Sequence, residues 1–158
     1  MKGKNYMKEA VFGFCLILVL SACTTIEPGS LPVNLGTWDV SCPPNYTGEM
    51  VITSFNTRDR NPHEDVVVHS FRGYFNWHNF GIYVGREYFD GTYEESDNPI
   101  LGRERIVRLN GTRLDSNGLV LNILSEYTAN VSADGNQLTG GTWRNSTGFG
   151  TWEAVWNR

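Results

Sequence analysis

Short runs that alternate between apolar and polar residues fill most of the sequence, and this pattern constrains the fold most strongly. Valine, isoleucine, threonine and aromatic residues dominate the runs, and turn-forming residues separate them at intervals of roughly ten residues. Such alternation is typical of strands with one buried face. Strands are predicted at Gly36–Cys42, Gly48–Phe55, Asp65–Arg72, Gly81–Phe89, Arg103–Leu109, Leu119–Leu124, Tyr127–Ser132, Gln137–Trp143 and Gly150–Trp156. No 3.6-residue apolar stripe follows residue 22, so we expect an all-β domain.

The turns between these runs favour antiparallel hairpins. Asp115–Gly118 contains an Asn-Gly pair and Ala133–Asn136 an Asp-Gly pair, which supply the positive φ of tight hairpins. Strands joined in this way leave two exposed sheet edges unless the sheet closes on itself. We therefore predict a small antiparallel up-and-down barrel of eight or nine strands.

The tripeptide Gly-Thr-Trp occurs in the first predicted strand and in the last two, at residues 36–38, 141–143 and 150–152. Glycine allows close backbone approach or bending in a barrel, and the tryptophan can fill the closed end. Gly36-Thr37-Trp38 resembles the G-x-W signature of lipocalins and avidin-type barrels (the calycins), and Ala133–Trp143 resembles a hairpin of avidin-like barrels. The resemblance implies the barrel architecture and transfers no ligand-binding residues.

The N-terminus has the features of a signal peptide. Lys2, Lys4 and Lys8 precede an apolar segment, Ala10–Leu20, which is too short to span a bilayer. Leu20-Ser21-Ala22-Cys23 resembles the bacterial lipobox, which implies that Cys23 is acylated, as with palmitate, and that the preceding segment is removed. We expect a cleaved helical signal peptide at 1–22, the lipidated cysteine and a flexible tether rich in Pro, Gly, Ser and Thr at 23–34, and the barrel domain at 35–158.

Charge limits the partners of the processed chain. It would carry ten arginines, no lysine and sixteen acidic residues, a formal charge of −6. An acidic domain of this kind is not expected to bind nucleic acid or anionic head groups through a basic patch. Membrane attachment is therefore expected through the acyl chains on Cys23. Thr24 follows the cysteine, where lipoproteins retained at the inner membrane commonly carry Asp, so we expect the periplasmic face of the outer membrane.

Cys42 is the one cysteine left after processing and lipidation. A reactive thiol or an intermolecular disulfide is one interpretation. The favoured interpretation is a buried apolar residue, because Trp38, Val40 and Cys42 share one face of an alternating strand.

No catalytic or metal-binding pattern emerges from the remaining residues. His63, His69 and His78 lack the spacing of a zinc site. The acidic segment Asp90–Asn98 lacks the spacing of a calcium loop and is predicted to be a solvated rim loop with an Asp-Gly turn. No nucleophile elbow is present, and nothing selects a pair of catalytic carboxylates. We expect no enzymatic activity, no metal and no cofactor.

Aromatic residues give the clearest indication of a binding surface. Residues 71–80 include five aromatic side chains and alternate less regularly than the other runs. Core packing explains many aromatics in a barrel, but an exposed cluster usually marks contact with a partner. Tyr74, Phe75, Trp77 and Phe80 are therefore the candidate binding residues, expected at the rim.

The sequence thus predicts an outer-membrane-anchored lipoprotein whose small β-barrel binds a small apolar or sugar-like ligand or a protein. The alternative is a periplasmic inhibitor or accessory protein, similar to the barrel-shaped lysozyme inhibitors. An acidic surface suits a basic lysozyme.

Overall fold

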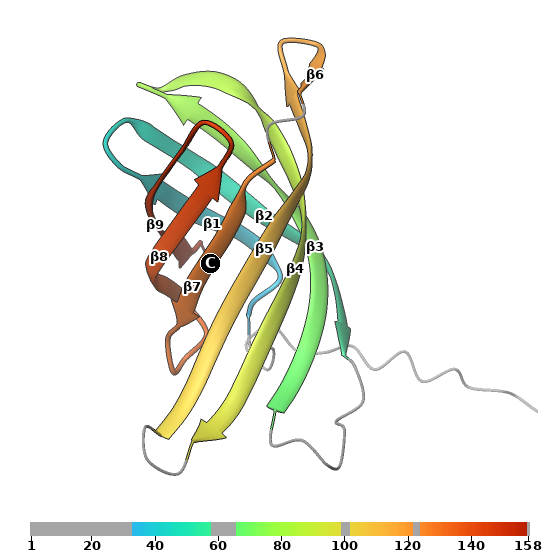
Figure 1. Cartoon of the computed structure of the whole chain (residues 1–158), viewed down its shortest axis with the longest axis vertical. Coiled ribbons are helices and arrows are strands. Elements are labelled where there is room, and N and C mark those ends of the chain that lie inside the picture. Colours follow the sequence, from blue (N-terminus) through green and yellow to red (C-terminus); the bar gives the residue numbers. More distant parts are fainter. Residues whose placement is uncertain (1–32, 58–65, 99–101, 122–123, 158) are drawn as a thin grey trace, which may run out of the picture.

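The computed structural model describes residues 33–57, 66–98, 102–121 and 124–157. Within these ranges the chain is all-β (Figure 1). The strands are β1 (Gly36–Cys42), β2 (Tyr46–Thr57), β3 (Val66–Asn79), β4 (Ile82–Asn98), β5 (Gly102–Ser116), β6 (Leu119–Leu121), β7 (Glu126–Val131), β8 (Gln137–Asn145) and β9 (Gly148–Trp156). None of the described residues belongs to a helix that is long and apolar enough to cross a membrane. The predicted signal peptide and Cys23 lie outside the described residues.

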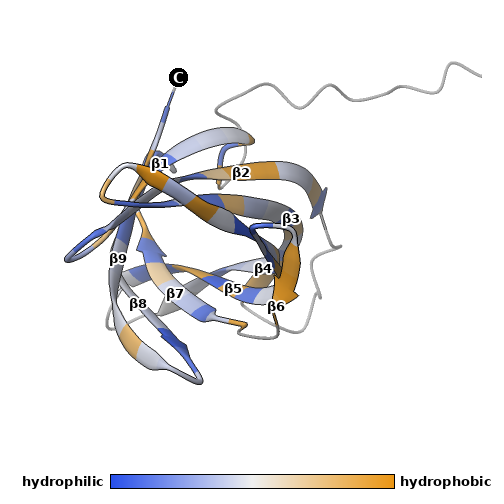
Figure 2. Cartoon of the chain, turned by 90° about the horizontal axis from the view of Figure 1, so that it is seen from above, coloured by the Kyte–Doolittle hydropathy of each residue, from blue (hydrophilic) through white to orange (hydrophobic). Residues whose placement is uncertain are grey.

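Eight of the strands form a closed antiparallel barrel, as the sequence predicts. The order around the ring is β1-β2-β3-β4-β5-β7-β8-β9, and β9 pairs with β1 to complete it. The ninth strand, β6, pairs only with the end of β5 and extends that hairpin beyond the ring (Figures 1 and 2). Closure leaves no free edge on the eight barrel strands, which removes the template for edge-to-edge association.

Two-residue turns set the register at one end of the barrel. Asn117 and Gly118 both have positive φ, as a tight hairpin requires, and they join β5 to β6 as the Asn-Gly signal predicts. Phe80 and Gly81 join β3 to β4 in the same manner, although Phe80 carries a side chain that disfavours its φ of 50°. The hairpins β1–β2, β3–β4, β5–β6 and β8–β9 therefore gather at one end, called the open end below.

The acidic segment Asp90–Asn98 corrects one prediction, because it is the second half of β4 rather than a rim loop. The Asp-Gly pair makes no turn there. Asp90 faces outward and accepts a hydrogen bond from Arg72 Nε at 3.0 Å. Gly91 faces inward, where a Cβ would lie 2.6 Å from the ring of Phe71. The glycine is required by the volume of a neighbouring ring and not by a turn.

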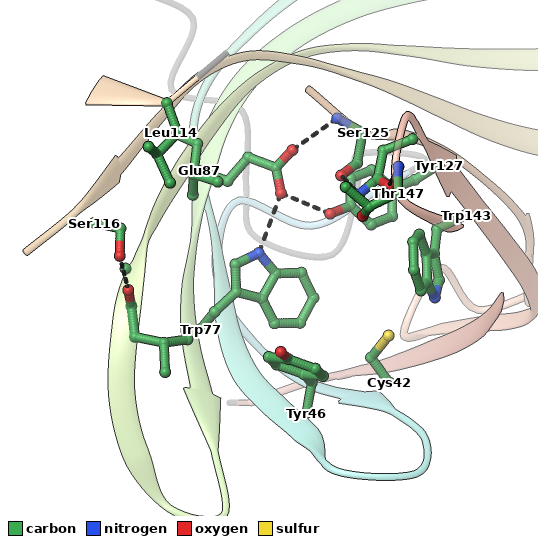
Figure 3. A pocket seen from close by; sticks show the side chains of 14 residues that line it. Cys42, Tyr46, Trp77, Glu87, Leu114, Ser116, Ser125, Tyr127, Trp143 and Thr147 are labelled. Carbon is green, nitrogen blue, oxygen red and sulfur yellow. Dashed lines mark hydrogen bonds between the residues drawn. The ribbon is translucent and has the colours of Figure 1, made fainter. Parts of the chain in front are cut away.

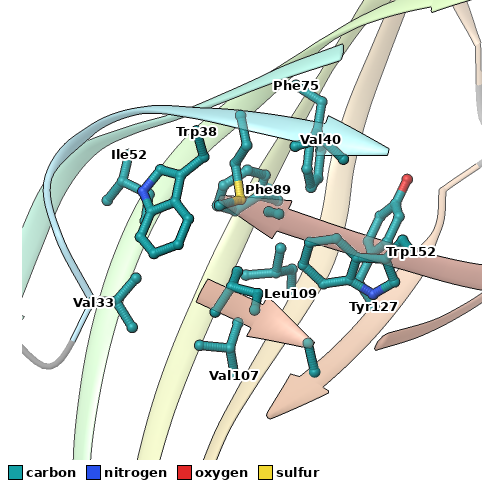
Figure 4. Close-up of a cluster of buried hydrophobic side chains, with 14 of the residues drawn as sticks. Val33, Trp38, Val40, Ile52, Phe75, Phe89, Val107, Leu109, Tyr127 and Trp152 are labelled. Atoms are coloured by element: carbon teal, nitrogen blue, oxygen red, sulfur yellow. The ribbon is translucent and has the colours of Figure 1, made fainter. Parts of the chain in front are cut away.

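Apolar side chains fill the middle of the barrel and the end opposite the open end (Figure 4). Trp38 and Trp152 are fully buried, and Phe75 packs edge-on against Trp152 with a centroid distance of 6.2 Å. Cys42 is buried and unbridged, on the same face as Trp38 and Val40, which confirms the interpretation of an inward-facing apolar residue.

The chain preceding β1 closes the second end, called the closed end. Val33 and Asn34, assigned to the tether from sequence, are buried there. The Asn34 side-chain amide donates to Asn136 Oδ1 at 2.9 Å in the β7–β8 turn, and its backbone carbonyl accepts from Trp38 Nε1 at 3.0 Å. The N-terminal segment thus holds the turn and the core tryptophan together at this end.

Trp38→Ala should lower the free energy of unfolding by about 3–5 kcal/mol, because it removes a fully buried indole and leaves a cavity at the closed end. Phe149→Ala is the matched control, since the Phe149 side chain is 88% exposed and surface changes cost about 0.5 kcal/mol or less. Denaturant unfolding of both variants measures the difference. Equal losses would contradict the assignment of Trp38 to the core.

Candidate functional site

A cavity of about 290 Å³ lies inside the open end of the barrel (Figure 3). Its volume is at the lower edge of the range of about 300–1,000 Å³ usual for small-molecule sites. Each of the strands β1 to β8 contributes to its lining, and so do the segment before β7 and the β8–β9 turn. The lining residues are Cys42, Tyr46, Trp77, Val84, Gly85, Glu87, Leu114, Ser116, Leu121, Ser125, Tyr127, Trp143, Asn145 and Thr147.

Glu87 places a carboxylate in this largely apolar space. Its side chain is only 3% exposed and points inward from β4, in phase with Phe89. Oε2 accepts hydrogen bonds from Tyr127 Oη at 2.6 Å and from Trp77 Nε1 at 3.2 Å. Oε1 accepts a hydrogen bond from the backbone N–H of Ser125 at 3.1 Å. Three neutral donors on β3, β7 and the segment before β7 therefore hold both carboxylate oxygens.

Glycine at position 111 makes room for the carboxylate. A Cβ there would lie 2.6 Å from Glu87 Oε1, so any larger residue would displace it. Burial raises the pKa of Glu87 above its ordinary value, and the hydrogen bonds from Tyr127, Ser125 and Trp77 oppose that shift. Burial and the nearby carboxylate likewise raise the pKa of Tyr127 well above its ordinary value.

Aromatic rings form much of the wall around Glu87. Trp77 and Tyr127 stack with a centroid distance of 6.3 Å and an interplanar angle of 21°. Tyr46 and Trp143 complete the wall, and Tyr46 is partly exposed.

Cys42 also lines the cavity. Burial raises the pKa of its thiol, an effect that the Trp143 indole partly offsets. The thiol therefore stays protonated and poorly nucleophilic at neutral pH.

Exposed apolar side chains surround the mouth of the cavity. The four hairpin tips at this end, residues 43–46, 79–85, 116–121 and 145–150, contain no charged residue. The large exposed side chains of this apolar rim are Tyr46, Phe80, Ile82, Tyr83, Leu119, Val120 and Phe149 on the tips, together with Leu124 just before β7. Figure 2 shows the hydrophobic character of β6 within it. Exposed apolar side chains gathered at one end of a domain usually mark a site of contact.

The four candidate binding residues occupy different parts of the barrel. Trp77 lines the cavity, and Phe80, 77% exposed, belongs to the apolar rim. Phe75 is fully buried in the core. Tyr74 faces outward, where the Arg86 guanidinium lies 4.2 Å from its ring centroid. The segment 71–80 thus contributes to the open end, but as an alternating strand with only part of its aromatics there.

The histidines do not converge with this site. His63 lies outside the described residues. His69 is half-buried between Phe55 and Tyr93, and burial lowers its pKa. His78 contacts Tyr83 near the β3–β4 turn. Within the part of the chain that the structure describes, no group of three or more His, Cys, Asp and Glu side chains could hold a metal ion.

Sequence reasoning missed the central residues of the cavity, Glu87 and Tyr127. One signal was available for Glu87. It precedes Phe89 by two residues in an alternating run, so a strand that buries Phe89 also turns Glu87 inward. Tyr127 has an equivalent phase with Ala129 and Val131 in β7, but the phase does not show that its hydroxyl meets a carboxylate.

Comparisons with known proteins add no relative to this picture. No protein-family model, no curated protein and no solved structure matches the chain. The cavity combines a buried carboxylate, stacked aromatic rings and an apolar mouth, a combination suited to binding a small molecule with both apolar and polar character.

Raising the pH should destabilise the protein relative to Glu87→Gln. The pKa of Glu87 is raised in the folded state, so the folded protein binds more protons than the unfolded chain at pH values between the two pKa values. Stability is consequently lost as pH rises from the ordinary glutamate value of 4.5 through the folded value. The difference in unfolding free energy between wild type and Glu87→Gln, measured by denaturant titration at several pH values, should fall over that window. A difference that is constant with pH would contradict the burial of this carboxyl group.

Tyr127→Phe should lower the free energy of unfolding by about 1.5–3 kcal/mol, because it removes a buried hydrogen bond to a carboxylate. Tyr83→Phe is the control, since Tyr83 is exposed and its change should be nearly silent. Chemical denaturation measures both. A Tyr127→Phe protein as stable as the Tyr83→Phe protein would show that the 2.6 Å contact contributes little.

Proposed function

We propose that this protein is a lipid-anchored binding protein of the bacterial outer membrane, on its periplasmic face, whose barrel takes up a small ligand in the cavity at the open end. The observation that carries the proposal is the cavity itself: about 290 Å³ of space, lined by aromatic rings, around one nearly buried carboxylate. A barrel filled throughout by side chains would leave no such space.

The division of the barrel into two parts supports this function. The tightly packed core lies toward the closed end and supplies rigidity, while Trp77, Glu87 and Tyr127 project from strands and not from loops. Sites on a rigid scaffold require little ordering when a ligand binds, which favours affinity. Tyr46 and Thr147 at the mouth are exposed, so the cavity communicates with solvent.

The proposed anchoring rests on the sequence Leu20-Ser21-Ala22-Cys23 behind its apolar segment. Acyl chains on one cysteine supply more than the marginal membrane affinity of a single chain, at about 0.8 kcal/mol per buried methylene. Thr24 supports the outer membrane as the destination, as argued from the sequence.

Cys23→Ser should abolish lipidation and leave unprocessed precursor, because the acceptor thiol is lost. Intact-mass measurement of the protein from bacterial membranes should show an acylated chain beginning at Cys23 for wild type and an unmodified full-length chain for the variant. Cys42→Ser serves as the control and should be processed normally. A wild-type chain that carries no acyl group would refute the proposed anchoring.

Thr147→Trp should obstruct the mouth and reduce ligand binding. Thr147 lies in the exposed β8–β9 turn at the cavity, whereas Thr151 is an exposed residue of β9 away from it, so Thr151→Trp is the matched control. Small molecules released by denaturing each purified protein from its native host would be compared by mass spectrometry. A compound that accompanies wild type and Thr151→Trp should fall at least tenfold in Thr147→Trp. Equal amounts in all three proteins would show that the cavity is not the binding site.

A second function, as an inhibitor or accessory protein acting on another protein, is favoured by the apolar rim. Leu119 and Val120 protrude on the β5–β6 hairpin with about two thirds of each side chain exposed. A protruding apolar hairpin on an acidic domain is a reasonable shape for contact with a basic enzyme. Titration of a lysozyme with wild type and with Leu119→Asp tests this function: inhibition that Leu119→Asp removes would favour it over uptake of a small ligand.

A further inference from the structure

In its ionised form Glu87 carries a charge that no neighbouring group offsets in the described part of the chain. Its hydrogen-bond donors are an indole, a phenol and a backbone amide, all neutral. The adjacent Arg86 points to the opposite face of β4, where Nε donates to Asn76 Oδ1 at 2.9 Å. A nearly buried carboxylate without a counter-ion is costly, so the site gains from any cation that enters it.

The hydrogen bonds to Glu87 also restrict what kind of cation fits. Both carboxylate oxygens already accept hydrogen bonds, and the 2.6 Å distance from Tyr127 Oη is in the range of charge-assisted bonds. A carboxylate has about four acceptor positions, and these bonds occupy three of them, so a ligand that brought several N–H donors would compete with Trp77, Tyr127 and Ser125. A ligand that supplies positive charge without donors leaves those bonds intact.

The aromatic walls have the complementary property. Trp77 and Tyr127 lie beside the carboxylate, and Tyr46 and Trp143 face the same space (Figure 3). The faces of indole and phenol rings attract cations, and aromatic enclosures of this composition suit quaternary ammonium groups in particular. Aliphatic substituents on the nitrogen would pack against Val84 and Leu114, which also line the cavity.

We propose that the ligand of this cavity is a small organic cation, an alkylated ammonium group that lies against Trp77, Tyr127 and Tyr46 with its charge offset by the Glu87 carboxylate. The inference rests on the proposed ligand-binding function and narrows its ligand from any small apolar or sugar-like molecule to one that carries a positive charge and apolar substituents.

The test compares choline with 3,3-dimethylbutan-1-ol, because the two molecules have the same shape and differ in the positive nitrogen. Full-length protein in a neutral maltoside detergent would be titrated with each, and the fluorescence of Trp77 and Trp143 in the cavity wall would report binding. Wild type should bind choline at least tenfold more tightly than the neutral alcohol.

Glu87→Gln tests the source of that preference, and Glu153→Gln, which changes an exposed carboxylate on β9, is its matched control. The choline preference should fall to about threefold or less in Glu87→Gln and stay unchanged in Glu153→Gln. Circular dichroism establishes that both variants are folded. If Glu87→Gln does not fold, the comparison of the two probes in wild type decides the question without it.

The outcomes separate this inference from the proposed function. Equal or tighter binding of the neutral alcohol, with sensitivity to Thr147→Trp, would overturn the cation while leaving the cavity as a binding site. A choline preference that survives in a folded Glu87→Gln protein would equally overturn the role given to the carboxylate. Failure of both probes to bind would overturn the inference, and the co-purification experiment with Thr147→Trp would then judge the proposed function by itself.

Discussion

Four residue pairs, from Trp38 opposite Trp156 to Ser41 opposite Glu153, join the first strand of the barrel to the last. Without this pairing β1 and β9 would be the two edges of an open sheet, and the inward face of each strand would lack part of its cover. Closure places Trp38 and Trp152 inside one continuous core. It also completes the wall of the cavity. Closure brings β1, which carries Cys42, near β8, which carries Trp143, and both side chains line the cavity.

The interior has two parts, a packed core toward the closed end and a cavity toward the open end. Toward the closed end, glycines on the inner face admit large rings: a Cβ at Gly73 would lie 2.6 Å from the ring of Phe89. Toward the open end a similar vacancy at Gly111 admits a carboxylate instead of a ring. Placing Glu87 there raises its pKa and costs stability in the charged form. A fold that accepts this cost in an otherwise apolar interior gains a polar group in a fixed position, which a binding site needs.

The architecture could be predicted from the sequence because it depends on local signals. Alternation located all nine strands, and the Asn117-Gly118 turn was found from its residue types alone. One error shows the limit of local signals. Glycine was interpreted as a turn former at Asp90-Gly91, but the strand continues there because the ring of Phe71 needs the space. That requirement comes from another strand, and no local pattern contains it.

The cavity could not be predicted from the sequence, for a related reason. Alternation shows which side chains point inward, but their depth along the barrel axis depends on the stagger between strands. The same Gly-Thr-Trp tripeptide therefore buries Trp38 and Trp152 in the core and places Trp143 on the cavity wall. Trp77 was among the predicted binding residues and lines the cavity, but its carboxylate partner lies ten residues away on the next strand and was not predicted.

Both described ends of the chain lie at the closed end, where the Trp156 indole donates to the Leu35 carbonyl. If the chain is held in a membrane through Cys23, the nine residues between that cysteine and Val33 span ten Cα–Cα steps, which extend at most about 35 Å. The attachment would then reach the barrel at its sealed base, at the end opposite the mouth of the cavity. A path from water to Glu87, open to charged compounds, would then begin at the end of the barrel remote from the attachment point.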